Sequence, residues 1–91
     1  MIESNIESYF KRRCKELNIF TIKNTGMRGI PDRLCVANGK TIWIELKRPG
    51  EKARPLQLAV IRKLEQHGAE VYILDNKQDV DVILRYLAKQ D

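Results

Sequence analysis

The chain has 91 residues and a net charge of +5, because 17 lysine and arginine residues outnumber 12 aspartate and glutamate residues. This length allows one small domain over residues 1–91, and the charge favours a polyanionic partner. No run approaches the roughly 18 apolar residues of a membrane span. The opening MIESNIESYF also lacks the basic and then apolar pattern of a signal peptide. We therefore exclude a membrane-spanning protein and expect a cytoplasmic one.

The first part of the chain predicts a helix, a strand and a loop. Apolar side chains recur at helical spacing over residues 3–17, which favours an amphipathic helix that ends near Asn18. Residues 19–22 are β-prone. They precede a loop, residues 24–29, whose two glycines permit a left-handed backbone or the close approach of a ligand.

Residues 30–37 and 40–47 predict two strands joined by a tight turn. The dipeptide between them, Asn38-Gly39, is the strongest short-range signal for a β-hairpin. With a two-residue turn, the register places Asp32 directly opposite Glu45. Alternation along the second strand puts Lys47 on the same face as Glu45.

The rest of the chain predicts a helix, a strand and a last helix. Pro55 suits the first turn of a helix that ends near residue 67. Residues 71–74 are a buried strand, and Asn76 can cap the final helix. The expected apolar stripe of the second helix consists of Leu56, Val60 and Leu64. The resulting order, αβββαβα, defines an α/β fold.

The cysteines and the histidine are expected to be structural. Cys14 and Cys35 lie alone in apolar patterns, without CxxC spacing or a nearby histidine. They are therefore expected to be buried free thiols, which fits a reducing cytoplasm. His67 is expected to be stabilised by the last carbonyls of its helix.

Opposed carboxylates at Asp32 and Glu45 repel each other unless a cation, a bound proton or Lys47 neutralises them. A divalent ion resolves the repulsion, and carboxylate oxygens suit Mg²⁺ or Mn²⁺ rather than zinc. The chemistry this implies is phosphodiester hydrolysis, in which Lys47 would orient or deprotonate water and stabilise charge on the phosphate. The alternative is that Asp32 is a turn residue and that Glu45 and Lys47 occupy the solvent face of an edge strand.

The sequence resembles a known nuclease family. GIPDR, followed by WIELKRPG and by PLQ at residues 55–57, is similar to the VRR-NUC family of the PD-(D/E)XK restriction-endonuclease-like nucleases. The likeness is closest to the small stand-alone members from bacteriophages and prophages. It covers nearly the whole chain and implies an αβββαβ core, followed here by a C-terminal helix.

The resemblance also implies roles for individual residues. Asp32 and Glu45 would be metal ligands, with the carbonyl of Leu46 completing the metal shell, and Lys47 would be the catalytic lysine. Further candidates are Gln57, which would support the metal site or its water, and Glu7, which would reach the site from the first helix. Glu3 competes with Glu7, and helical periodicity does not separate them.

Basic residues near the proposed site are candidates for DNA binding. Arg28, Arg48 and Lys52 are the best candidates for phosphate contacts. The others are expected on solvated faces: Lys11, Arg12, Lys15, Lys23, Arg33 and Arg54. Arg13 falls within the apolar stripe of the first helix, where it would snorkel or reach a carboxylate of the site.

We therefore expect a Mg²⁺- or Mn²⁺-dependent endonuclease that recognises DNA structure, with Holliday junctions as the leading substrate and flaps or nicked duplex next. Cutting two strands needs two sites, which a two-fold homodimer would supply, and the resemblance points the same way. The main alternative is a non-catalytic nucleic-acid-binding module with the same fold. An RNA-processing enzyme of this fold and a generic binder of acidic proteins are weaker alternatives.

Overall fold

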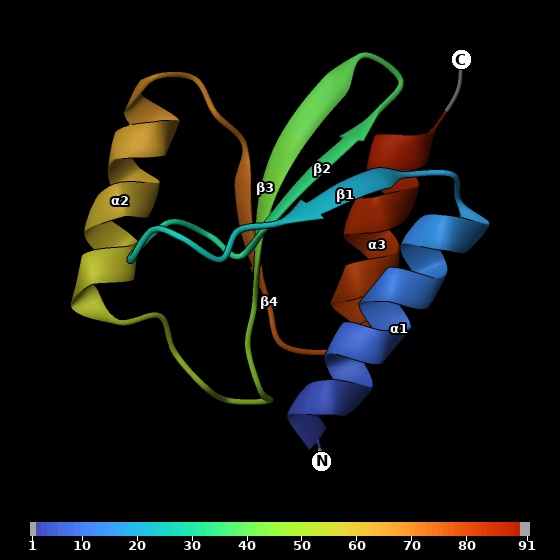
Figure 1. Cartoon of the computed structure of the whole chain (residues 1–91), viewed down its shortest axis with the longest axis horizontal. Coiled ribbons are helices and arrows are strands. Elements are labelled where there is room, and N and C mark those ends of the chain that lie inside the picture. The colour runs from blue at the N-terminus through green and yellow to red at the C-terminus, as the bar shows by residue number, and fades with distance from the viewer. Residues whose placement is uncertain (1, 90–91) are drawn as a thin grey trace.

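Helices and strands follow one another in the predicted order, αβββαβα (Figure 1). The structure, a computed structural model, describes residues 2–89 and the side chains of residues 6–89. The elements are α1 (Ile2–Glu16), β1 (Phe20–Lys23), β2 (Arg33–Ala37), β3 (Lys40–Leu46), α2 (Pro55–Gln66), β4 (Val71–Leu74) and α3 (Lys77–Ala88). Strand β2 begins later than residue 30, because Pro31 has no N–H to donate to a ladder.

The four strands form one sheet in the order β1-β2-β3-β4. β1, β2 and β3 are antiparallel neighbours, and α2 crosses over to bring β4 parallel to β3. Asn38 and Gly39 have φ values of 52° and 74°, as the tight β2–β3 turn requires. Arg33 pairs with Ile44, so the next positions along the hairpin are Asp32 and Glu45, in the predicted register.

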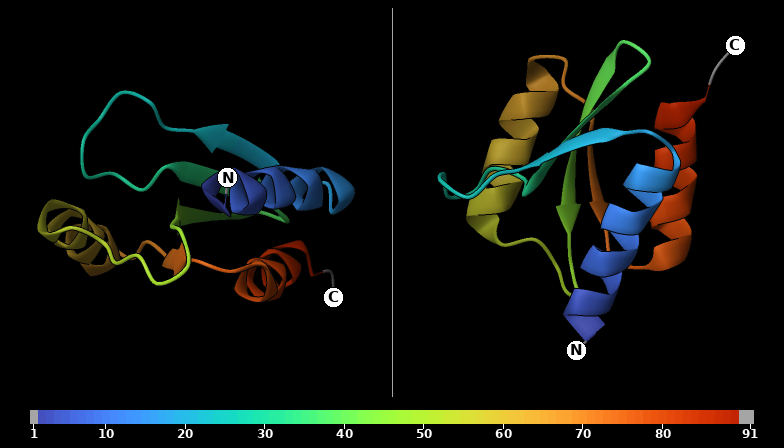
Figure 2. Two further views of the ribbon diagram at one scale, coloured as in Figure 1. Left: turned by 90° about the horizontal axis from the view of Figure 1, so that it is seen from below. Right: turned by 45° about the vertical axis from the view of Figure 1, so that its right-hand side comes forward.

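The helices cover the two faces of the sheet unequally. α1 and α3 pack together on one face, while α2 lies on the other (Figure 2). The core between α1, α3 and the sheet contains Ile6, Phe10, Cys14, Ile19, Cys35, Ile42, Ile44, Leu74, Val80, Leu84 and Leu87. Cys14 and Cys35 are buried and free, as predicted.

Polar contacts join α1 to α3. The Tyr9 hydroxyl donates to Asp81 at 2.7 Å, and Arg13 Nε donates to the same carboxylate at 2.9 Å. Arg13 also pairs with Glu16 on its own helix, at 2.6 Å. Arg13 therefore joins the two helices and reaches no carboxylate of the proposed site.

The second helix differs from its prediction along one face. Ile61 is its buried side chain, whereas Leu56, expected in the core stripe, is 54% exposed. The helix packs mainly against β4, and Leu56 in its first turn extends beyond the core. His67 ends the helix, with Nδ1 at 2.8 Å from the carbonyl of Lys63, as predicted. No helix within residues 2–89 is long and apolar enough to cross a membrane.

Gly29 holds the loop of residues 24–29 against α2. Its φ is +83°, a region that L-residues rarely occupy. A Cβ added there would lie 3.0 Å from both Leu56 Cγ and Val60 Cγ2. Backbone conformation and close packing therefore both require glycine.

Gly29→Ala should lower the free energy of unfolding by about 1–2 kcal/mol, because it adds left-handed strain and a collision with α2. Urea unfolding followed by fluorescence of the single tryptophan, Trp43, measures the change. Gly26→Ala is the matched control, because an added Cβ there meets nothing within 4 Å. Equal stability of the two variants would show that the contact of the loop with α2 is unimportant.

Candidate active site

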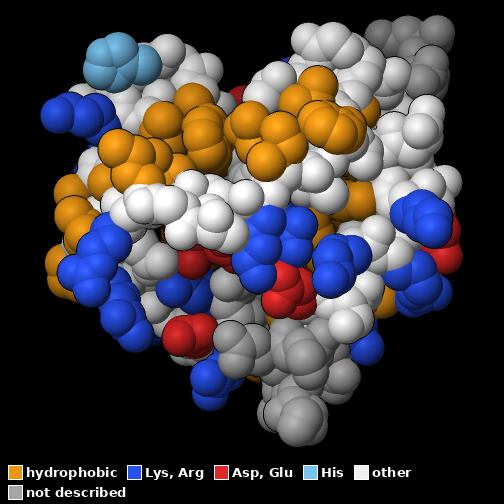
Figure 3. All heavy atoms as spheres, viewed as in Figure 1, with side chains coloured by type: hydrophobic (Ala, Val, Ile, Leu, Met, Phe, Trp, Pro, Cys, Tyr) orange, Lys and Arg blue, Asp and Glu red, His pale blue; other side chains and the backbone are white. Residues whose placement is uncertain are grey.

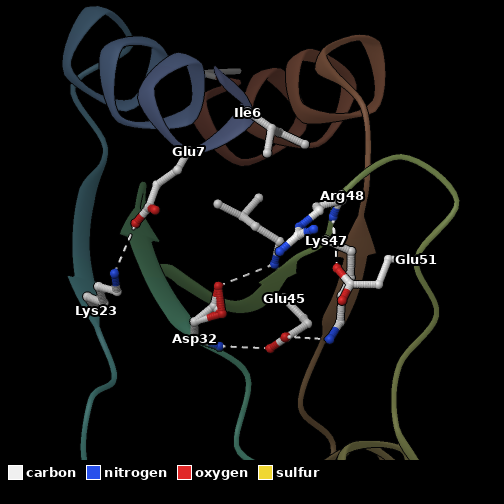
Figure 4. Close-up of a pocket in the computed structure, with 9 residues that line it drawn as sticks. Ile6, Glu7, Lys23, Asp32, Glu45, Lys47, Arg48 and Glu51 are labelled. Atoms are coloured by element: carbon white, nitrogen blue, oxygen red, sulfur yellow. Dashed lines mark hydrogen bonds and ion pairs between the residues drawn. The ribbon is translucent and has the colours of Figure 1, made fainter. Parts of the chain in front are cut away.

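A hollow of about 310 Å³ opens where the first helix approaches the end of β3 (Figure 4). It is lined by Ile6, Glu7, Lys23, Asp32, Glu45, Leu46, Lys47, Arg48 and Glu51. The structure thus brings together acidic and basic residues that the sequence singles out: Glu7 on α1, Asp32 just before β2, Glu45 on β3 and Lys47 just after it.

Asp32 and Glu45 form an acidic pair across the hairpin. The backbone N–H of Asp32 donates to Glu45 Oε1 at 3.0 Å, and the N–H of Leu46 donates to Asp32 Oδ2 at 3.4 Å. The Glu45 side chain is buried. Burial first, and the neighbouring charge of Glu45 second, raise the pKa of Asp32 to about 6. The repulsion expected from the register is therefore present.

Lys47 and Gln57 complete a hydrogen-bonded cluster around Glu45. Lys47 Nζ lies 3.3 Å from Glu45 Oε2 and donates to Gln57 Oε1 at 2.9 Å. Gln57 Nε2 in turn donates to Glu45 Oε2 at 2.9 Å. Gln57 Oε1 also accepts the N–H of Arg54 at the start of α2, at 2.9 Å. The first turn of α2 therefore fixes the direction of the amide that holds Glu45 and Lys47.

The burial of this cluster contradicts the edge-strand alternative. β3 lies between β2 and β4. Glu45 is only 6% exposed and Lys47 only 8% exposed. Two charged side chains at the end of a central strand are costly to bury. Stability of the fold alone therefore does not explain why Glu45 and Lys47 stand there.

Glu7 approaches the hollow from α1 and is held by two cations. Its Oε2 accepts from Arg33 at 2.8 Å and from Lys23 at 3.1 Å, and Figure 4 shows the carboxylate turned toward Lys23. Hydrogen bonds from Lys23 and then from Arg33 lower the pKa of Glu7. The side chain of Glu3 lies outside the described residues.

Arg33 corrects the expectation of a solvated position. It is 5% exposed, because alternation along β2 turns it toward the core, with its guanidinium 5.4 Å from the ring of Phe10. In the part of the chain that the structure describes, Arg33 Nε has no hydrogen-bond partner. Glu7 is therefore the main counter-charge of the buried Arg33 guanidinium.

The three predicted phosphate-binding residues are all exposed, but they differ in their position relative to the acidic pair. Arg48 lines the acidic hollow. Arg28 lines a neighbouring hollow with Asp32, on the other side of the site. Lys52 lies in the segment between β3 and α2, outside the residues that line these two hollows.

Two residues that line the hollow were not predicted there: Glu51 was not predicted at all, and Lys23 was expected on a solvated face. Glu51 accepts the N–H of Arg48 at 3.1 Å, and this hydrogen bond lowers its pKa. No motif marks Glu51, because its approach depends on the turn after β3. Lys23 lines the hollow through its ion pair with Glu7, a contact between distant parts of the sequence.

The donor set fits a hard divalent cation. Among the described residues, no group of three or more His, Cys, Asp or Glu side chains is placed to hold a metal ion. The protein side chains that could bind an ion here are therefore the two carboxylates of Asp32 and Glu45. Two carboxylates are enough for Mg²⁺, which is commonly held by one or two carboxylates together with waters and substrate phosphates.

Comparison with known proteins identifies the fold and the relatives of this chain. A solved structure described as "VRR_NUC domain" matches with a TM-score of 0.81, at 24% identity, over 94% of this chain and 97% of that chain. The fold is therefore that of the VRR-NUC class of restriction-endonuclease-like nucleases.

The sequence itself is 39% identical over 85 residues to "Putative nuclease p44" of Acyrthosiphon pisum secondary endosymbiont phage 1. This match covers 90% of this chain and 90% of the relative. No sequence model of a protein family matches the chain. The chain therefore belongs to the same family as p44, and its fold is that of a VRR-NUC domain.

The raised pKa of Asp32 predicts a pH-dependent stability in EDTA. Between the ordinary value of 3.8 and about 6, the folded state binds the Asp32 proton more tightly than the unfolded state. The contribution of Asp32 to stability therefore falls as pH rises through this window. Asp32→Asn should be more stable than wild type near pH 7.5, and the difference should shrink toward pH 4 in urea unfolding.

Asp75→Asn is the control, because the pKa of Asp75 is shifted down whereas that of Asp32 is shifted up. A hydrogen bond from the N–H of Gly50 lowers the pKa of Asp75. This variant should therefore be less stable than wild type near pH 7.5, with the gap closing as pH falls. A pH-independent difference between wild type and Asp32→Asn would contradict the repulsion of the acidic pair.

Glu7→Gln should lower the free energy of unfolding by about 2 kcal/mol, because it leaves the buried Arg33 without a counter-charge. Thermal unfolding with and without Arg33→Met measures the coupling. In the Arg33→Met background, the change at Glu7 should cost little. Glu16→Gln, on an exposed carboxylate, is the control. Equal costs at Glu7 in both backgrounds would contradict the pairing.

Proposed function

We propose that the protein is a divalent-metal-dependent endonuclease that hydrolyses phosphodiester bonds in branched DNA, such as Holliday junctions. The observation that carries this proposal is the acidic pair of the half-buried Asp32 and the buried Glu45, with Lys47 Nζ 3.3 Å from Glu45 Oε2. A module that only binds DNA has no use for two repelling carboxylates and a buried lysine on a central strand. A metal-dependent nuclease needs all three.

Asp32 and Glu45 are the residues that would hold Mg²⁺ or Mn²⁺, with the carbonyl of Leu46. Glu7, which Arg33 and Lys23 hold at the margin of the hollow, would reach the ion only through water. When bound, such an ion polarises the scissile phosphate and lowers the pKa of a coordinated water. The support for this assignment is the oxygen-only donor set and the raised pKa of Asp32, which marks a place where positive charge is favourable.

Lys47 would act on the water and the phosphate. Its ammonium is held beside Glu45 by Gln57, so it is already oriented before substrate binds. It would donate a hydrogen bond to the attacking water or to a phosphate oxygen, where negative charge develops during hydrolysis. Gln57 would act as a positioning residue, because it binds both Glu45 and Lys47 and is itself fixed by the start of α2.

Basic side chains on two sides of the site would bind the DNA backbone. Arg28 and Arg48 flank the acidic pair from different segments, and Lys52 follows in the exposed segment after β3. Such contacts fix the position of DNA without reading bases, which suits an enzyme that recognises a branched shape. A homodimer would supply the second site for paired cuts, acting in the cytoplasm of a bacterial host in recombination, repair or phage genome processing.

The test is cleavage of end-labelled four-way junction, flap, nicked and plain duplex DNA with Mg²⁺, Mn²⁺ or EDTA. We expect cutting of branched DNA with either metal and none in EDTA. Lys47→Ala and Asp32→Ala should each reduce the rate at least about 100-fold. Lys11→Ala, on an exposed position of α1, is the control and should cut normally. Junction binding without cutting under every metal would instead establish the non-catalytic module.

A further inference from the structure

A second hollow, on the α2 side of the acidic pair, has only cations among its charged side chains. This basic hollow has a volume of about 440 Å³ and is lined by Arg28, Gly29, Lys47, Arg54, Leu56 and Gln57. Among the described residues, no carboxylate lines it. Figure 3 shows lysine and arginine side chains gathered near the start of α2, at the left of the molecule. The basic hollow therefore offers a place for an anion.

Two segments that are far apart in the sequence build the basic hollow. Gly29 packs against α2, since a Cβ added there would lie 3.0 Å from both Leu56 Cγ and Val60 Cγ2. This contact brings Arg28, the residue before Gly29, to the same hollow as Arg54 at the start of α2. Both arginine side chains are exposed, but close packing of the loop on the helix fixes the backbone that carries Arg28.

Arg54 stands where another residue type would stabilise the helix better. It is the N-cap of α2 and makes no capping hydrogen bond through its side chain, because a guanidinium has no acceptor. Asn76, the N-cap of α3, shows the usual arrangement, in which its side chain accepts the N–H of Asp79 at 2.8 Å. Ser, Thr, Asp and Asn are preferred at such positions for this reason. The stability of α2 therefore does not explain an arginine at position 54.

The basic hollow adjoins the hollow at the acidic pair through Lys47. Lys47 lines both hollows and is buried. Gln57, which accepts from Lys47 at 2.9 Å, also lines the basic hollow. An anion in the basic hollow would therefore lie next to a phosphate bound at Asp32 and Glu45. Successive phosphates of one DNA strand are joined through a single sugar, so one strand can supply both.

We propose that the basic hollow binds the DNA backbone phosphate next to the scissile one, with Arg28 and Arg54 as its ligands. Arginine suits this role, because its planar fork of donors matches the oxygens of a phosphate. Two arginines from different segments would hold the phosphate from two sides and fix the path of the strand across the acidic pair. That the neighbouring phosphate is the scissile one rests on the proposed nuclease function, whereas binding of a backbone phosphate does not.

Binding of a four-way junction in EDTA tests the two arginines without cleavage. Arg54→Ser and Arg28→Ser should each weaken binding about 10-fold and should reduce the slope of log affinity against log salt by about one. Arg62→Ser is the matched control and should bind normally, because Arg62 is exposed on the same helix and lines none of the three hollows near the site. An equal loss with Arg62→Ser would show a general effect of positive charge and would overturn the proposal.

Arg54→Ser also separates DNA binding from folding. Serine supplies the capping oxygen that arginine lacks. The variant should therefore unfold at a higher urea concentration than wild type, although it binds DNA more weakly. A loss of both stability and affinity would show that Arg54 acts through the fold, and would overturn its assignment as a phosphate ligand.

Junctions with a single methylphosphonate, which removes the charge of one phosphate, identify the bound group. At one position this change should weaken binding to wild type about 10-fold and should have little further effect on Arg54→Ser or Arg28→Ser. In a protein that cuts DNA, this coupled phosphate should lie next to the cut. A coupled phosphate in a protein that cuts nothing supports the basic hollow and contradicts the nuclease. Additive effects at every phosphate, coupling only to a terminal phosphate, or a coupled phosphate remote from the cut would overturn the proposal.

Discussion

The repulsion between Asp32 and Glu45 is the constraint on which the rest of the site depends. The half-buried carboxylate of Asp32 meets the buried carboxylate of Glu45 across a hairpin, and the pKa of Asp32 rises to about 6 as a result. Stability alone would favour apolar side chains at both positions. The surrounding groups, above all Lys47 and Gln57, hold this unfavourable pair in place. A divalent cation between the two carboxylates would remove their repulsion and would be attracted by both of them. The pair that lowers the stability of the metal-free protein would therefore be the pair that binds the metal.

Each level of the structure contributes to this arrangement. The Asn38-Gly39 turn fixes the register, and the register fixes which residues face each other. The crossover through α2 makes β3 a central strand and places Gln57, in the first turn of the helix, over Glu45. The same crossover leaves Phe20 and Ile22 of β1 exposed.

The sequence was most informative where the determining interactions are local. The element order, the hairpin register and the meeting of Asp32 with Glu45 follow from turn chemistry and from alternation along strands. Alternation along β2 turns Arg33 inward, but its ion pair with Glu7 did not follow from the sequence, because it depends on how α1 packs against the sheet. The approach of Glu51 did not follow either, because it depends on the turn after β3. Leu56 was predicted in the core from helical periodicity, but it is exposed. Periodicity shows which face of a helix is apolar, and it does not show how far along the helix the sheet covers that face. The family resemblance supplied Gln57, which periodicity alone would have left as a surface residue.

The most direct test of the central claim is where a divalent ion binds. Crystals grown with Mn²⁺ and measured at the manganese absorption edge would locate the ion independently of any assay of activity. The account predicts anomalous density between the carboxylates of Asp32 and Glu45, lost in Glu45→Gln. Density elsewhere, or none at the acidic pair in a protein that still cuts DNA with Mn²⁺, would contradict it.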